Sequence, residues 1–541
     1  MTRLSVASFK PSAVLFASLL VTTSACASAP AARREAPVQR HPLIVVVVVD
    51  QMRGQYLDDY GAKFTAGFKR LMTGGAWFRR AAYPYLNTIT CAGHSTIGTG
   101  AMPYRHGMIL NAWWDRASAR SNPCTSDPSA KNIGYAGNPS GGDSAGALLA
   151  PPLGQQVREK GGRSVSLSLK ARSAITMVGK DATAVLWFDE RTGWTTSSAF
   201  TGKPLDWIQQ FVEANPLERD RGRVWERLLP PTAYVGDEEG KGERSVVGWT
   251  PPFPHRVGEP PAQFLAQWQR SPFADEYLVR LAIHAVDTLD LGRGPTTDFI
   301  SVSFSSLDLV GHRHGPASYE VQDMLFRLDR TIATLLDHLD ARLGREGYVL
   351  ALAADHGVAE IPEQSGGGRV ASAAITAAIE KALTQAFGPG KYVARAEYTN
   401  IYLAAGVLAK LQRSPQASDA VLDAARAVPG IAYAFRSDEV DGPEARASAD
   451  PVKRAAALSH NPSRSGDLIV VPRPNWILSS DATSHGTLYP YDQRVPVIFF
   501  GAGVQPAVLD SPATPADIAP TLATLAGVSF SAPDGTPLLK R

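Results

Sequence analysis

The sequence of 541 residues has few cysteines, few long apolar runs and no large excess of either positive or negative charge. Its three cysteines have no metal-binding spacing, so a thiolate metal site is not expected. Beyond the N-terminal region no segment has the roughly 18 uninterrupted apolar residues that a membrane-spanning helix needs. With 54 Lys and Arg against 51 Asp and Glu, the net charge of +3 predicts no nucleic-acid-binding surface.

The first 27 residues have the pattern of a secretory signal peptide. Arg3 and Lys10 precede an apolar stretch at 13–21, which small residues follow. Residues 28–41 then form a linker rich in Pro, Ala and Arg, so the mature protein is expected to be soluble and periplasmic or secreted. Lipid attachment at Cys26 is the alternative processing route, although Thr-Ser-Ala upstream matches it poorly.

Two further cysteines, Cys91 and Cys124, belong to the expected mature chain. An even pair in an oxidising compartment suggests a disulfide. Two separate buried thiols fit the sequence equally well.

Residues 43–49 predict a strand buried on both faces of a parallel sheet, because the run is apolar at every position and rich in valine. Further strands are predicted at 164–169, 182–188, 298–304, 348–354 and 495–500. A helical stripe of apolar residues spans 321–339, and its place between two strands indicates a β-α-β unit. One helix is predicted over 56–72.

These elements predict an α/β fold with a mostly parallel central sheet and helices on both faces. A single catalytic domain is expected over 42–541. Two segments within it, about 195–275 and about 361–480, are interpreted as insertions, the first because Pro, Gly and mixed charges crowd its middle.

Polar residues follow several of the predicted strands. In open α/β sheets ligands bind beyond the carboxyl ends of the strands, so these side chains are expected at one site. The strand-end residues are Asp50, Lys170, Asp308 and the pair Asp355-His356; His312 stands four residues after Asp308, and His485 lies in a polar Ser-His-Gly loop. Three Asp and three His without thiolate suit Zn²⁺, with Mn²⁺ or Fe as alternatives, and His314 is an alternative to His312.

Thr90 begins the segment Thr-Cys-Ala-Gly-His-Ser. A threonine at a helix start is usually an N-cap. Next to a divalent cation its hydroxyl can instead be deprotonated and act as a nucleophile. The remaining histidines, including His94 and His255, are interpreted as structural or surface groups.

Taken together, these motifs resemble the alkaline phosphatase superfamily, and most closely its secreted bacterial phosphatases related to type I phosphodiesterase/nucleotide pyrophosphatase. The matching pieces, in order, are Asp50-Gln51-Met52-Arg53, Thr90 before Gly93-His94-Ser95, Asn111 within Asn-Ala-Trp-Trp-Asp, Lys170-Ala171-Arg172, Asp308-Leu-Val-Gly-His312, Asp355-His356-Gly357, Ser484-His485-Gly486 and Asp517-Ile-Ala-Pro-Thr521.

The resemblance implies an alkaline phosphatase that hydrolyses phosphate monoesters through a phosphothreonine on Thr90. It implies two Zn²⁺ per chain. The ligands would be Asp308, His312 and His485 for one ion, and Asp50, Asp355 and His356, with Thr90, for the other.

The resemblance also bears on the substrate. Asn111, Lys170 and Arg172 would bind the phosphoryl group, and the Lys-x-Arg pair resembles the monoesterases of this branch. A phosphodiesterase or nucleotide pyrophosphatase with the same metals is the alternative. The expected substrates are small phosphorylated metabolites or nucleotides, and the chain is expected to be a monomer.

Overall fold

The computed structural model describes residues 41–250 and 252–540. The expected signal peptide at 1–27, with Cys26, and all of the expected linker except its last residue lie outside the described residues. No helix in the described ranges carries an apolar stretch long enough to span a bilayer.

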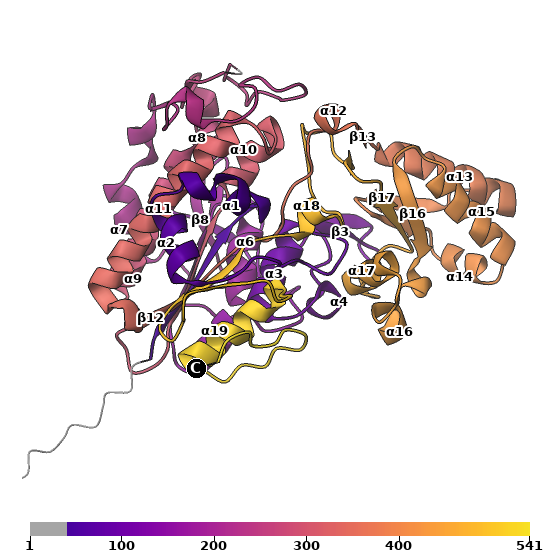
Figure 1. Cartoon of the computed structure of the whole chain (residues 1–541). Helices are drawn as coiled ribbons and strands as arrows, with labels where there is room; N and C mark the ends of the chain where they lie inside the picture. Colours follow the sequence, from indigo (N-terminus) through magenta and orange to yellow (C-terminus); the bar gives the residue numbers. More distant parts are fainter. Residues whose placement is uncertain (1–40, 251, 541) are drawn as a thin grey trace, which may run out of the picture. The chain divides into compact units, whose positions relative to one another are not determined.

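A ten-stranded sheet forms the centre of the fold (Figure 1). Its order is β20 (Ala507–Leu509), β2 (Ala76–Phe78), β19 (Val497–Gly501), β12 (Tyr348–Ala353), β1 (Leu43–Val49), β11 (Phe299–Phe304), β6 (Ser164–Ser168), β7 (Ala184–Asp189), β8 (Gly193–Ser197) and β5 (Asn132–Gly134). The strands from β12 to β7 are parallel, whereas β19 and β8 run antiparallel to their central neighbours. The predicted α/β fold with a mostly parallel sheet is confirmed.

The side chains of β1 alternate between two hydrophobic cores. Val45, Val47 and Val49 pack in one core with α9 (Pro272–Thr288) and α11 (Tyr319–Leu343). Ile44, Val46 and Val48 pack in the other with α6 (Ala171–Val178) and α19 (Ile518–Ala526). Helices therefore cover both faces of the sheet, as predicted, and no face of β1 meets water.

The single helix predicted over 56–72 is wrong. The chain forms α1 (Gln55–Tyr60) and α2 (Gly67–Gly74), separated by a short 3₁₀ turn and an extended segment. The Asp329 carboxylate, from α11, accepts hydrogen bonds from the N–H groups of Thr65 and Phe68 at 2.8 and 2.7 Å. This capping group comes from a residue far along the chain, so the local pattern does not contain it.

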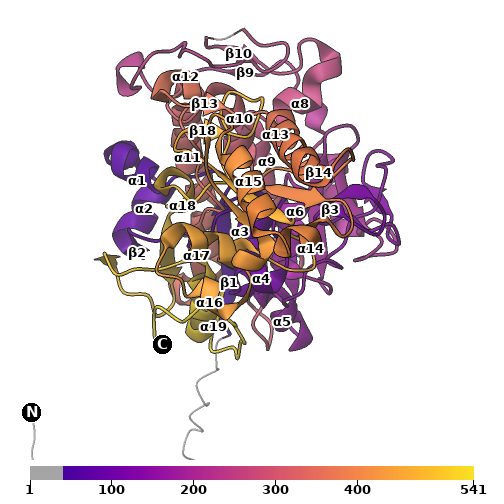
Figure 2. The same ribbon diagram turned by 90° about the vertical axis from the view of Figure 1, so that its right-hand side faces the viewer.

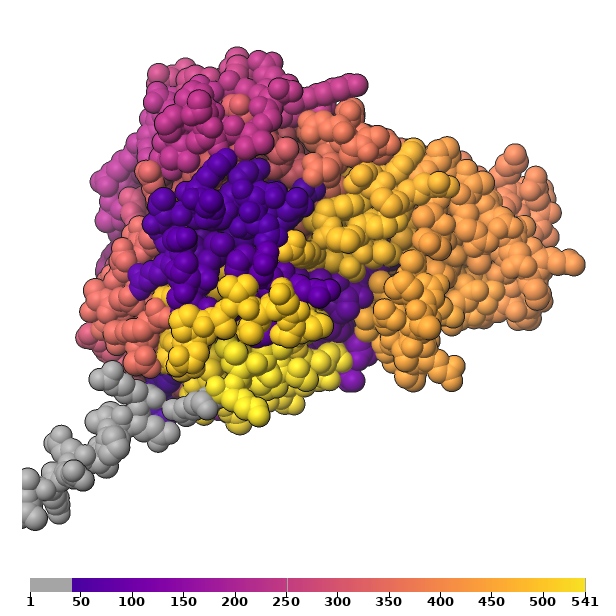
Figure 3. All heavy atoms as spheres, in the orientation of Figure 1, coloured from indigo at the N-terminus to yellow at the C-terminus, as the bar shows by residue number. Residues whose placement is uncertain are grey.

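A four-stranded antiparallel sheet lies within the segment 361–480. Its order is β14 (Val393–Glu397), β15 (Asn400–Leu403), β17 (Leu468–Pro472) and β16 (Ile431–Arg436). With α13 (Ser372–Phe387) and α15 (Pro415–Arg426) it encloses a core of its own. Its surface forms the orange lobe in Figure 3.

The segment 195–275 contains little regular structure apart from short elements. They include β9 (Val224–Trp225), which pairs with β10 (His255–Arg256), and α8 (Phe264–Trp268). In Figure 2, β9, β10 and α8 lie at the same end of the fold as α10 (Ser306–His314). We refer to residues 195–275 as the cap segment; its origin as an insertion stays a prediction.

Candidate active site

The carboxyl ends of four neighbouring parallel strands bring polar side chains to one edge of the sheet. Asp50 follows β1, Lys170 follows β6, Asp308 lies in α10 just after β11, and Asp355-His356 follow β12. All five side chains are buried. Buried charged groups persist only when they are paired or bind a cation, so their clustering marks a site.

Asp50, Asp355 and His356 form the first group. Their candidate ligand atoms all lie within 4.8 Å of one another. His356 Nε2 is 3.4 Å from Asp50 Oδ1 and 3.4 Å from Asp355 Oδ2. Asp50 Oδ1 makes no hydrogen bond within the described chain, whereas Asp355 Oδ2 also lies 3.1 Å from His94 Nδ1. Buried carboxylate and imidazole lone pairs that face one another in this way suit a divalent cation.

Asp308 is the centre of the second group. Its Oδ1 lies 3.3 Å from His312 Nε2 and 3.6 Å from His485 Nε2. The compact set within 4.8 Å contains Asp308, His485 and His356, and the His356 and His485 rings stack with centroids 3.5 Å apart. The two groups are therefore contiguous through His356. His314, the alternative to His312, points elsewhere, toward Glu243 and Glu320.

The three histidines share one orientation. Each places Nδ1 against a main-chain carbonyl oxygen, at 3.1 Å from His312 to Thr483, 2.9 Å from His356 to Gly357 and 3.0 Å from His485 to Thr88. If Nδ1 donates its proton to the carbonyl, Nε2 carries a free lone pair directed into the cluster. Metal-binding histidines usually donate the proton of the nitrogen that does not bind the metal, here Nδ1, to such an acceptor.

Burial and the charges within the cluster shift the pKa values of its carboxylates. Burial, followed by the nearby charges of Asp308 and Asp355, raises the pKa of Asp50 well above its usual value. Burial acts the same way on Asp308, but the Lys170 ammonium and His312 outweigh it and hold the pKa of Asp308 well below its usual value. The cluster therefore needs cationic partners to hold its carboxylates ionised.

Lys170 is one such partner. Its Nζ lies 2.6 Å from Asp50 Oδ2 and 2.5 Å from Asp308 Oδ2. Although burial lowers the pKa of Lys170, these two carboxylates outweigh that effect and raise it. The residue predicted to bind substrate thus contacts two predicted metal ligands. Arg172, two residues on, has a buried Nε without a hydrogen bond.

Thr90 is the first residue of α3 (Thr90–Thr99) and is buried. Its Oγ1 lies 3.4 Å from His356 Nε2. Gly93 allows this approach, because a Cβ there would lie 2.1 Å from the main-chain oxygen of Asp355. The start of α3 therefore packs directly onto the end of β12, and the Thr90 hydroxyl reaches the carboxylate and imidazole cluster.

A disulfide joins Cys91 to Cys124. Asn111 lies between the two half-cystines: its Oδ1 accepts a hydrogen bond from Cys91 N–H, and its main-chain oxygen accepts one from Cys124 N–H, both at 2.9 Å. With Oδ1 engaged in this way, the Nδ2 amide is the group that Asn111 can offer to a ligand.

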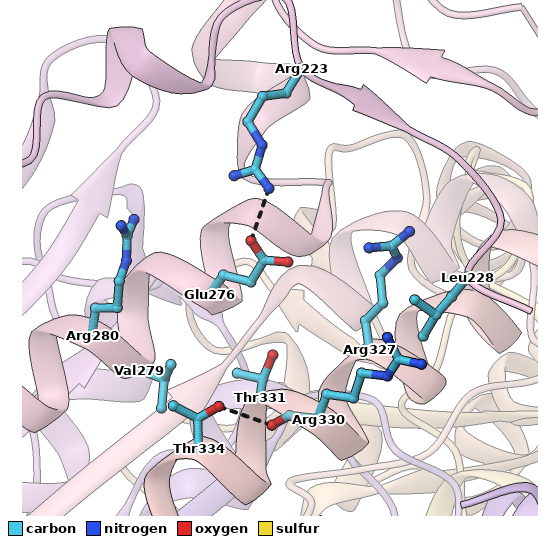
Figure 4. Close-up of a pocket in the computed structure, with 9 residues that line it drawn as sticks. All are labelled: Arg223, Leu228, Glu276, Val279, Arg280, Arg327, Arg330, Thr331 and Thr334. Atoms are coloured by element: carbon cyan, nitrogen blue, oxygen red, sulfur yellow. Dashed lines mark hydrogen bonds and ion pairs between the residues drawn. The ribbon is translucent and has the colours of Figure 1, made fainter. Parts of the chain in front are cut away.

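A cavity of about 640 Å³ opens beside the cluster. Lys170 and Arg172 line it, together with Trp187 and Gln269. A separate cavity of about 380 Å³ is lined by arginines including Arg223 and by none of the predicted site residues (Figure 4). Its Arg223 pairs with Glu276 at 3.2 Å.

Two residues at the site were not among the predicted ligands. Gln51 donates from Nε2 to Asp308 Oδ1 at 2.7 Å and from its main-chain N–H to Asp355 Oδ1 at 3.2 Å, so it links the two groups. His94, interpreted from the sequence as structural or surface, places Nδ1 3.1 Å from Asp355 Oδ2. The only sequence signal for them is their place in the matching motifs, beside Asp50 and four residues after Thr90.

Comparison with known proteins identifies the family of the chain. Residues 44–493 match the family described as type I phosphodiesterase / nucleotide pyrophosphatase. The chain is 30% identical over 516 residues to alkaline phosphatase PafA of Elizabethkingia meningoseptica, covering 92% of this chain and 94% of that protein. It is 29% identical over 528 residues to alkaline phosphatase PhoV of Synechococcus elongatus, covering 92% and 94%.

Solved structures of related proteins superpose on this chain. The crystal structure of wild-type alkaline phosphatase PafA superposes with a TM-score of 0.83 at 29% identity, covering 93% of this chain and 99% of that one. Murine ectonucleotide pyrophosphatase / phosphodiesterase 5 gives a TM-score of 0.53 at 13% identity, which shows a shared fold.

Proposed function

The chain belongs to the type I phosphodiesterase / nucleotide pyrophosphatase family of the alkaline phosphatase superfamily, and on that basis we propose that it is an alkaline phosphatase acting on phosphate monoesters. One observation carries the proposal: a threonine hydroxyl lies 3.4 Å from the imidazole shared by two clusters of carboxylates and histidines. Such a cluster supplies what phosphoryl transfer needs, namely a nucleophile next to sites for cations.

The ligand chemistry supports two Zn²⁺ per chain. Asp50, Asp355 and His356 would hold one ion; Asp308, His312 and His485 would hold the other. The donor set contains carboxylate and imidazole only, and the buried Oδ1 of Asp50, which makes no hydrogen bond within the described chain, fits such an ion. Zinc, when bound, supplies positive charge that favours a deprotonated hydroxyl and stabilises oxyanions of the transferring phosphoryl group.

Thr90 is the nucleophile of the proposed reaction. Its Oγ forms a bond to phosphorus as the bond from phosphorus to the ester oxygen breaks, and the alcohol leaves with a proton. Water then attacks the phosphothreonine, the bond from phosphorus to Oγ breaks, and inorganic phosphate leaves while Thr90 regains its proton. Splitting the displacement in this way restores the enzyme after each turnover.

Lys170 and Arg172 favour a monoester over a diester. A phosphate monoester carries one more negative oxygen than a diester, and these two cations line the 640 Å³ cavity beside Thr90's cluster. Asn111 adds a neutral donor through Nδ2, held in place by its contacts to Cys91 and Cys124. Small phosphorylated metabolites or nucleotides are the proposed substrates.

The disulfide supports an exported protein. Disulfides persist in oxidising compartments, and Cys91–Cys124 lies within the fold next to Thr90. Together with the leader predicted at 1–27, it favours a periplasmic or secreted location.

The decisive experiment traps the intermediate. The zinc-loaded protein, mixed with p-nitrophenyl phosphate and quenched in acid, should carry a phosphate on Thr90 by mass spectrometry. Thr90→Ala should abolish both this adduct and turnover. Thr99→Ala, in the same helix, is the matched control and should retain both. Turnover in the Thr90→Ala protein equal to that of the wild type would refute the proposal.

A second comparison separates monoester from diester chemistry. The double variant Lys170→Ala/Arg172→Ala should lose about 10²-fold or more in kcat/KM for p-nitrophenyl phosphate, because charge-assisted hydrogen bonds are worth about 1.5–3 kcal/mol each. The loss for bis-p-nitrophenyl phosphate should be much smaller. Equal losses for the two substrates would favour the phosphodiesterase alternative.

A further inference from the structure

A second cluster of histidine and glutamate lies outside the phosphatase site. It consists of Glu243 and His255 from the cap segment, His314 at the end of α10 and Glu320 in the first turn of α11. The first two residues are far along the chain from the last two, so the tertiary fold alone assembles the cluster. Figure 2 places β9 and β10 of the cap segment at the same end of the fold as α10.

The atoms are spaced as metal ligands. His314 Nδ1 lies 3.6 Å from Glu320 Oε2 and 3.9 Å from Glu243 Oε2, and the ligand atoms of these three residues all lie within 4.8 Å of one another. Two ligands of a tetrahedral zinc, each bonded at about 2.0–2.1 Å, stand roughly 3.4 Å apart. Only small side-chain movements would bring the three donors to that spacing.

Hydrogen bonding does not account for the cluster. The separations of 3.6 and 3.9 Å exceed hydrogen-bond distance. Glu320 Oε2 is buried and makes no hydrogen bond within the described chain. The other oxygen of that carboxylate, Glu320 Oε1, lies 2.9 Å from His255 Nε2. Residues that orient a metal ligand commonly contact it in this way.

The charge of the cluster is also uncompensated. Glu320 has no exposed side-chain surface and Glu243 only 10%. Among the described residues, no Lys or Arg forms an ion pair with either glutamate; their only ion-pair partners are His255 and His314. One buried and one largely buried carboxylate next to imidazoles, with no Lys or Arg partner among the described residues, suit a divalent cation.

We infer that Glu243, His314 and Glu320 form a structural zinc site, with His255 orienting Glu320. The metal would join the irregular cap segment to α10, the helix that carries Asp308 and His312. A long segment with little regular structure gains most from such a link, because metal binding supplies folding free energy. The inference goes beyond the phosphatase activity and does not depend on it.

Zinc content of the full-length protein tests the site. After zinc loading and gel filtration, the wild type should hold about three ions per chain by elemental analysis, and Glu243→Gln about two. Glu239→Gln, at an exposed glutamate of the same segment, is the matched control and should keep all three. Equal zinc content in the wild type and Glu243→Gln would overturn the inference.

Anomalous diffraction at the zinc edge tests the same site without relying on a variant. A peak within bonding distance of His314 Nδ1 and Glu320 Oε2 would support it, and density at the phosphatase cluster alone would refute it. The two proposals also fail separately. His485→Gln should affect zinc at the phosphatase site but leave the anomalous peak at His314, and Glu243→Gln should leave p-nitrophenyl phosphate turnover unchanged.

Discussion

Removing the disulfide should weaken both the fold and the phosphatase site. Cys91 and Cys124 are separated by 33 positions in the sequence. In the chain-entropy model, closing a loop of that length lowers the entropy of the unfolded chain enough to stabilise the native state by about 4 kcal/mol. The variant Cys91→Ala/Cys124→Ala should lose a free energy of unfolding of that size.

The effect on catalysis follows from Asn111. Both of its hydrogen bonds at 2.9 Å come from the main-chain N–H groups of the half-cystines, so the disulfide holds the residue from two sides. Without that support, the Asn111 amide is no longer preorganised. The loss of one well-placed hydrogen bond, about 1–1.5 kcal/mol, corresponds to roughly tenfold in kcat/KM.

Two measurements check this prediction. Urea unfolding should show a lower midpoint for the double variant than for the wild type. Asn111→Ala should reduce kcat/KM for p-nitrophenyl phosphate strongly in the wild type and little in the disulfide-free protein, since the two changes remove the same positioned amide. Equal reductions in both backgrounds would refute the positioning role.

Three further predictions concern packing, metal and pH. Gly93→Ala should lower stability by about 1–3 kcal/mol and reduce turnover, because its Cβ would lie 2.1 Å from the Asp355 main-chain oxygen; thermal unfolding and a steady-state assay measure both. Chelation should abolish p-nitrophenyl phosphate release and lower the melting temperature, and added Zn²⁺ should restore both; activity that survives complete zinc removal would contradict the assigned chemistry. Burial raises the pKa of Asp492 from 3.8 to about 7. Its contribution to stability is therefore full below pH 3.8 and falls as the pH rises through about 7, so Asp492→Asn should flatten the decline in melting temperature over that window; an unchanged slope would argue against it.

Periodicity in the sequence predicted the core of the fold. The uninterrupted apolar run at 43–49 predicted a strand buried on both faces, and β1 lies between two hydrophobic cores. The stripe at 321–339 predicted a helix, which the structure shows as α11. These patterns depend only on which side chains of one element are buried. They can therefore be recognised without knowing which other elements pack against it.

The split between α1 and α2 could not be predicted in this way. The Asp329 carboxylate that caps α2 belongs to α11, more than 250 residues further along the chain. The same limit applies to Gln51 and His94, whose significance at the site depends on their contacts with Asp308 and Asp355.

The sequence by itself determined which strands are buried and that polar residues follow them, because both depend on the order of side chains along one element. Only the tertiary structure decided that His314 faces Glu243 and Glu320 instead of Asp308, and that Cys91 and Cys124 are bonded on either side of Asn111. Those outcomes depend on how distant segments pack together. The order of residues along one segment does not give its distance from the others.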